Sequence, residues 1–132
     1  RMAGGIPGVY EVQGLPVTPY MVPQDCGMHM QTKWLEIVRK TSLDNTDRGG
    51  RSSRLKITAE EGKDFAFSCL PYTAQELENA MHHEELPPAR RTVVSILGAV
   101  RGVGGINSWG ADVEDIYHIS GEQDISYGFW IE

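Results

Sequence analysis

The sequence lacks the features that identify membrane, nucleic-acid-binding and disulfide-rich proteins. No run in its 132 residues approaches the roughly 18 consecutive apolar residues that a membrane-spanning helix requires. Positive charge is scarce, because 12 Lys and Arg stand against 18 Asp and Glu, and a net charge of −6 would repel nucleic acid. The two cysteines, Cys26 and Cys69, lie far apart in the chain, which favours partly buried thiols over a disulfide. We therefore expect neither a membrane nor a nucleic acid as a partner.

Familiar catalytic, phosphate-binding and metal-binding motifs are also missing. No GxSxG segment presents a serine nucleophile, and the glycine-rich run at 101–105 precedes neither Gly-Lys-Ser/Thr nor a helix that would hold a phosphate. Cys26 and His29 have the spacing of metal ligands, but no second pair completes a tetrahedral site. His82 and His83 would project about 100° apart on a helix, so they cannot close on one ion. We expect structural roles for both clusters.

Acidic residues occur in pairs, yet none of these pairs suggests catalysis. Glycoside hydrolysis needs two carboxyl groups held across a cleft, about 5 to 5.5 Å apart or more. The acidic candidates lie at a turn or in polar, surface-like runs, and we interpret each as a solvated charge. They are Glu60, Glu61, Glu84, Glu85, Asp112, Glu114 and Asp115. Taken by itself, the chain shows no catalytic constellation.

The composition favours a single compact domain over residues 1–132. A hydrophobic content of 40% with 23% charged residues is ordinary for a globular protein, and the length suits one core. The chain begins at Arg1 and carries no charged-then-apolar leader, so we expect it to be a piece of something longer.

The hydrophobic pattern predicts an antiparallel all-β fold, most simply a β-sandwich, with one short helix. Phe65, Phe67 and Cys69 alternate with small residues, which predicts a strand with one face in the core. The β-branched run at 91–100 favours a strand buried on both faces. The helix is expected at 72–86, where Thr73 and Glu76 have capping-box spacing. The remaining strands are expected at 31–39, 54–59, 115–119 and 124–132.

A tryptophan follows the glycine-rich run RGVGGINSWG, residues 101–110. The glycines are expected to let the backbone turn tightly as it leaves a strand. Neighbours of this kind cannot easily shelter Trp109, whose ring could stack on a sugar and contribute about 1 kcal/mol beyond area burial. The alternative is that Trp109 anchors a core or an interface. Trp34 and Trp130 lie in alternating segments and are expected to be packing residues.

Several segments carry a resemblance to a known family. YTAQELENAMHHEEL, RTVVSILGAVRGVGGINSWG, YHIS and the final FWI resemble the C-terminal domain of the large, multidomain β-galactosidases of glycoside hydrolase family 2. The upstream PYMVPQDCGMHMQTKWLEI is similar to a Pro-Gln-acid-x-Gly segment and strand of the same domain. The resemblance covers about residues 8–132. Two positions depart from the family pattern, Ile106 and Leu97, where acidic residues are common.

The resemblance implies a β-sandwich related to galactose mutarotase. This sandwich would be the last domain of an enzyme that removes terminal β-D-galactose from lactose-like substrates with retention of configuration. It implies that the catalytic glutamates and magnesium, and sodium as well, belong to other domains, among them a TIM barrel absent here. It also implies that the loop tryptophan, Trp109, reaches the mouth of the active site, with Ser108 and Asn107 beside it. The fragment alone is expected to be inactive and to hold no cofactor.

Two other classes of function stay open. One is a free-standing carbohydrate-binding module that uses Trp109 and Asn107 as a surface site. The other is an aldose mutarotase, suggested by fold analogy alone. Exposed strand edges would allow a homo-oligomer, and a cytoplasmic and an exported compartment both stay open.

Overall fold

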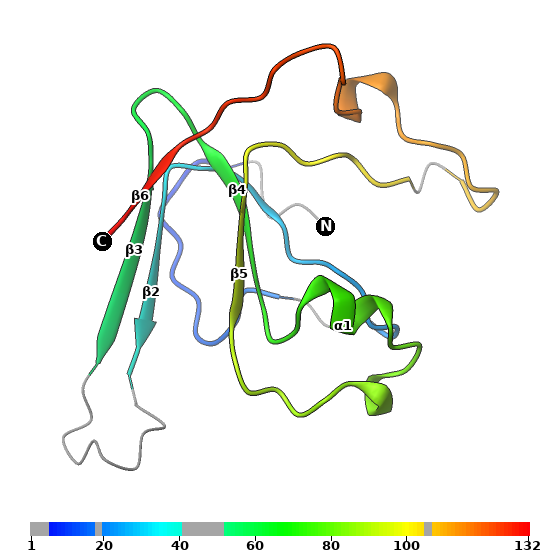
Figure 1. Ribbon diagram of the computed structural model, residues 1–132, viewed down its shortest axis with the longest axis horizontal. Coiled ribbons are helices and arrows are strands. Elements are labelled where there is room, and N and C mark those ends of the chain that lie inside the picture. Colours follow the sequence, from blue (N-terminus) through cyan, green and yellow to red (C-terminus); the bar gives the residue numbers. More distant parts are fainter. Residues whose placement is uncertain (1–5, 18–19, 41–51, 105–106) are drawn as a thin grey trace. The chain divides into compact units, whose positions relative to one another are not determined.

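The computed structural model describes residues 6–17, 20–40, 52–104 and 107–132 (Figure 1). The chain forms two compact units, the first made of Arg1–Met30 and Ala66–Leu97, the second of Gln31–Phe65 and Gly98–Glu132. In the described ranges the strands form two three-stranded sheets, in the orders β1-β4-β5 and β2-β3-β6, with one short α-helix. The predicted all-β class is confirmed, with two antiparallel sheets of the kind that make a β-sandwich.

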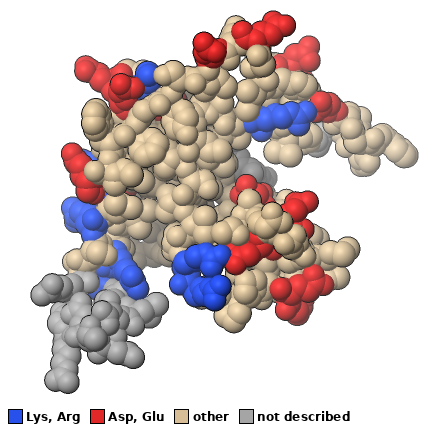
Figure 2. All heavy atoms as spheres, in the orientation of Figure 1, with Lys and Arg blue, Asp and Glu red and all other residues tan. Residues whose placement is uncertain are grey.

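Figure 2 shows Asp and Glu side chains distributed over several parts of the face drawn. Within the described ranges, no helix has the length and apolar character that crossing a membrane would take.

β4 (Phe65–Leu70) is the central strand of the first sheet, between β1 (His29–Thr32) and β5 (Val93–Leu97). β4 and β5 are antiparallel, with Phe67 opposite Ile96. All six residues of β4 are buried, so the prediction that only one face enters the core is wrong. β5 is half-buried along its length instead of buried on both faces, because it lies at the end of the strand order.

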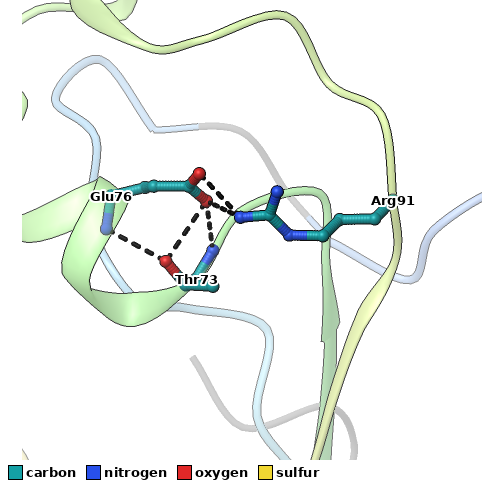
Figure 3. Close-up of polar contacts among 3 residues, drawn as sticks. All are labelled: Thr73, Glu76 and Arg91. Carbon is teal, nitrogen blue, oxygen red and sulfur yellow. Dashed lines mark hydrogen bonds and ion pairs between the residues drawn. The ribbon is translucent and has the colours of Figure 1, made fainter.

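The helix α1 (Ala74–Glu78) begins where the capping box predicts (Figure 3). Thr73 Oγ1 accepts a hydrogen bond from the backbone N–H of Glu76 at 3.2 Å, and Glu76 Oε2 accepts one from the N–H of Thr73 at 2.9 Å. Arg91 Nη2 lies 2.6 Å from both carboxylate oxygens of Glu76. These contacts, the Thr73 backbone bond foremost, hold the pKa of Glu76 below its ordinary value.

The predicted helix at 72–86 is longer than the observed one. α1 ends at its C-cap Asn79, and the 3-10 helix η1 (His83–Glu85) follows. Glu85 Oε2 accepts a hydrogen bond from the backbone N–H of Met81 at 2.8 Å. That side-chain bond satisfies a donor that a continuing helix would pair with a backbone carbonyl, so the chain turns here.

The second sheet contains β2 (Trp34–Arg39), β3 (Ser53–Ala59) and β6 (Phe129–Ile131). Both pairings are antiparallel, and Leu35, Ile57 and Ile131 align across the three strands. The strand expected at 124–132 is therefore confirmed only for its last part. Phe65, the first residue of β4, belongs to the second unit and is almost fully buried. Its ring meets that of Phe129 edge-on, with ring centroids 6.4 Å apart.

Trp34 and Trp130 occupy one row of this sheet, on either side of Thr58. Their exposed fractions are 44% and 67%, so the prediction that both are packing residues is wrong for the described chain. The prediction that both tryptophans lie in strands is confirmed, but the alternation of apolar and polar residues did not show which face of the sheet is covered.

Candidate functional site: the tryptophan loop

The glycine-rich segment forms one side of a long loop, residues 101–118, which we call the tryptophan loop. Its outgoing arm, 101–104, and its return arm, 111–118, run beside each other to the tip (Figure 1). The backbone N–H of Gly102 donates a hydrogen bond to the carbonyl oxygen of Tyr117 at 2.8 Å. The strand expected at 115–119 is instead the 3-10 helix η2 (Asp115–Tyr117), in which the Tyr117 N–H bonds to the Glu114 carbonyl oxygen at 2.9 Å and the His118 N–H to that of Asp115 at 3.1 Å.

The glycines of the outgoing arm serve a close approach between backbones. A Cβ placed on Gly102 would lie 2.6 Å from Tyr117 Cβ, and one on Gly104 would lie 2.9 Å from the carbonyl oxygen of Ala111. Residues 101–104 form neither a turn nor a bend, and neither glycine has a positive φ, so the prediction that these two glycines turn the chain is wrong. The left-handed turn falls at Gly110, with φ of 80°. Gly105 and Ile106 lie outside the described residues.

The three predicted sugar-contacting residues lie together at the tip. Trp109 is 92% exposed, and Ser108 and Asn107 are exposed beside it. Asn107 Oδ1 accepts hydrogen bonds from the backbone N–H groups of Trp109 at 2.9 Å and Ala111 at 3.4 Å. Such an Asx turn fixes the backbone on which the indole is carried.

Three charged or titratable residues join the two arms of the loop. Arg101 Nη2 lies 2.6 Å from Asp112 Oδ1, and the same oxygen accepts a hydrogen bond from the N–H of Val113 at 2.8 Å. His118 Nε2 lies 3.1 Å from the carbonyl oxygen of Val113 and 3.5 Å from Asp112 Oδ2. The Val113 bond and the Arg101 guanidinium lower the pKa of Asp112. Sequence reasoning missed this cluster, although opposite charges on either side of the glycine run were a signal.

The histidines make hydrogen bonds and a ring contact within the chain. His83 Nε2 lies 2.6 Å from the carbonyl oxygen of Tyr20, and His82 Nδ1 lies 3.1 Å from Glu85 Oε1. His29 stacks on Phe67 with ring centroids 4.7 Å apart. In the part of the chain that the structure describes, no three His, Cys, Asp or Glu side chains converge as metal ligands.

The cysteines and carboxylates also follow the sequence interpretation. Cys26 and Cys69 are thiols, and burial raises the pKa of both. Glu60 pairs with Lys63 at 2.9 Å. All seven acidic candidates are exposed, as solvated charges should be.

Comparison with known proteins links this chain to β-galactosidases. Residues 1–131 match the family described as Beta galactosidase small chain. The chain is 60% identical over 131 residues to the Beta-galactosidase small subunit of Latilactobacillus sakei, covering 99% of this chain and 41% of that protein. It is 39% identical over 108 residues to Beta-galactosidase BgaC of Bifidobacterium adolescentis, covering 82% of this chain and 9% of that protein.

A longer relative matches from end to end of this chain. The Beta-galactosidase of Streptococcus thermophilus is 33% identical over 133 residues, covering 100% of this chain and 12% of that protein. The chain therefore spans less than half the length of these curated relatives. No solved structure matches it. The match along nearly the whole chain shows that it belongs to the β-galactosidase small-chain family.

Proposed function

We propose that this chain is the C-terminal part of a β-galactosidase. This enzyme hydrolyses terminal, non-reducing β-D-galactose residues from lactose-like substrates, with retention of configuration at the anomeric carbon. Its role is to present Trp109 to the sugar at the mouth of an active site built by the rest of the enzyme. Homology to larger β-galactosidases, of which this chain covers 9% and 12%, supports a role within such an assembly.

The exposure of Trp109 is the observation that carries this proposal. An indole that is 92% exposed at a loop tip contributes little to packing within its own chain. Its face suits the apolar C–H face of a sugar ring, and stacking adds about 1 kcal/mol beyond area burial. Ser108 and Asn107 lie beside it with polar groups that can meet sugar hydroxyls.

Catalysis is assigned to other parts of the enzyme. Retaining hydrolysis uses two carboxyl groups about 5 to 5.5 Å apart, one as nucleophile and one as acid and base. The acidic residues of the tryptophan loop are instead exposed, and Asp112 is held by Arg101. We place the catalytic glutamates, magnesium and sodium on those other domains, including a TIM barrel, and we propose that the chain alone is inactive.

Replacing Trp109 in the β-galactosidase that contains this chain tests the role of the indole. Trp109→Ala should raise KM for lactose about fivefold, which corresponds to the loss of about 1 kcal/mol of stacking. Met21→Ala is a matched control, because Met21 is 95% exposed and lies in the other unit. Unchanged kinetics of Trp109→Ala on lactose would refute the proposal.

A free-standing carbohydrate-binding module is the alternative that the exposed indole also favours. Titration of the separate chain with galactose, followed by tryptophan fluorescence, distinguishes the two functions. We expect no saturable quenching at millimolar sugar, because the rest of the pocket lies on other domains. Saturable quenching that is lost in Trp109→Ala would favour the binding module.

A further inference from the structure

We propose that Asp112 is a positioning residue for Trp109, acting through its ion pair with Arg101. The inference rests on the function proposed for Trp109. It assigns a role to charged residues that join the two arms of the loop and do not themselves lie at its tip.

The contacts place Asp112 where the two arms of the tryptophan loop are tied together. One carboxylate oxygen receives both the Arg101 guanidinium at 2.6 Å and the Val113 N–H at 2.8 Å. The first contact joins the outgoing arm to the return arm, and the second fixes the carboxylate to the return arm itself. Val113 is only 8% exposed, so this end of the arm is anchored in the unit.

His118, further along the return arm, also contacts Asp112 and Val113. Its Nε2 lies 3.1 Å from the Val113 carbonyl oxygen and 3.5 Å from Asp112 Oδ2. Together with the Gly102 to Tyr117 backbone bond, these contacts fix the course of the return arm beside the outgoing arm. The orientation of Trp109 depends on them, because an almost fully exposed side chain is positioned by its backbone.

We expect these contacts to affect the position of the loop more than the stability of the whole unit. Arg101 and Asp112 side chains are 52% and 60% exposed, and ion pairs at such positions contribute little to global stability. Breaking the pair should therefore loosen the loop without unfolding the unit. The measurable result is weaker sugar binding at unchanged turnover.

A double-mutant cycle in the β-galactosidase that contains this chain tests the inference. Asp112→Asn keeps the size of the side chain and removes its charge. It should raise KM for lactose about two- to fivefold with kcat unchanged, and should add nothing when Trp109→Ala is already present. Lys63→Gln is the control, because it breaks the exposed pair with Glu60 away from the loop, and its KM should equal that of the wild type.

The outcomes separate this inference from the function on which it rests. If Trp109→Ala raises KM and Asp112→Asn does not, the positioning role is refuted and the proposed function stands. An equal effect of Asp112→Asn in both backgrounds also refutes it, because Asp112 would then act without Trp109. If Trp109→Ala leaves KM and kcat unchanged, the proposed function is refuted, and the positioning role is refuted with it.

Discussion

Adding one methyl group at Gly102 should separate the arms of the tryptophan loop. In Gly102→Ala the new Cβ would lie 2.6 Å from Tyr117 Cβ and 3.3 Å from Tyr117 Cγ. Ordinary van der Waals contact begins near 3.4 Å, so the arms must move apart by roughly 1 Å. Tyr117 Cβ is bonded directly to its backbone, and a change of rotamer cannot relieve the contact.

The structural cost of Gly102→Ala has two sources. Overpacking of this kind typically costs about 1–3 kcal/mol. The same movement stretches the Gly102 N–H bond to the Tyr117 carbonyl oxygen, now 2.8 Å, and a lost hydrogen bond is worth about 1 kcal/mol. We therefore expect the free energy of unfolding to fall by about 2–4 kcal/mol.

Urea unfolding followed by circular dichroism measures this change. With a slope of about 2 kcal/mol per molar urea, the midpoint should fall by about 1–2 M. Gly121→Ala is the matched control, because no atom lies within 4 Å of its added Cβ and its φ is not positive. Exchange of the residue-102 amide hydrogen should also accelerate. If Gly102→Ala matches Gly121→Ala in both measurements, the close-approach argument is refuted.

Two further predictions concern pH. The pKa of Glu76 is lowered in the folded chain, chiefly by the Thr73 N–H, so its stabilising effect is present at neutral pH and is lost as pH falls below about 4.3. Thermal unfolding at neutral and acid pH should show a smaller acid loss in Glu76→Gln than in the wild type, and equal losses would contradict this. The pKa of Cys69 is raised by burial, so the unfolded thiol ionises first and stability falls as pH rises above about 8.5. Urea midpoints across that range should fall less in Cys69→Ala, and parallel curves would disprove the effect.

Local sequence patterns predicted the parts of the fold that short-range forces determine. The capping box of Thr73 and Glu76 satisfies backbone donors within one turn, so the start of α1 is where the sequence indicates. The strand expected at 54–59 pairs with the 34–39 part of the strand expected at 31–39, because their β-branched and apolar residues suit a sheet. The prediction of one continuous strand is wrong, since residues 31–32 belong to β1 in the other sheet. The family resemblance, carried by the segments around residues 91–110, is confirmed over nearly the whole chain.

Patterns failed where a distant partner determines the local structure. The alternation in β4 predicted one buried face, but only the tertiary structure decided that Ala66 and Ser68 are covered as well. The pattern at 115–119 suits a strand, yet the folded chain forms η2 there and pairs the Tyr117 carbonyl oxygen with Gly102 of the outgoing arm.

In the tryptophan loop, too, the sequence predicted some features and the tertiary structure decided others. Composition alone indicated that a tryptophan in a glycine-rich segment has little shelter, and Trp109 is indeed 92% exposed. The reason for its glycines is tertiary, because the space a Cβ would need at Gly102 and Gly104 is filled by the return arm. The pairing of Arg101 with Asp112 is also tertiary, since only the folded loop brings these charges to 2.6 Å. The sequence by itself determined which side chain is presented, and the packing of the two arms decided how it is held.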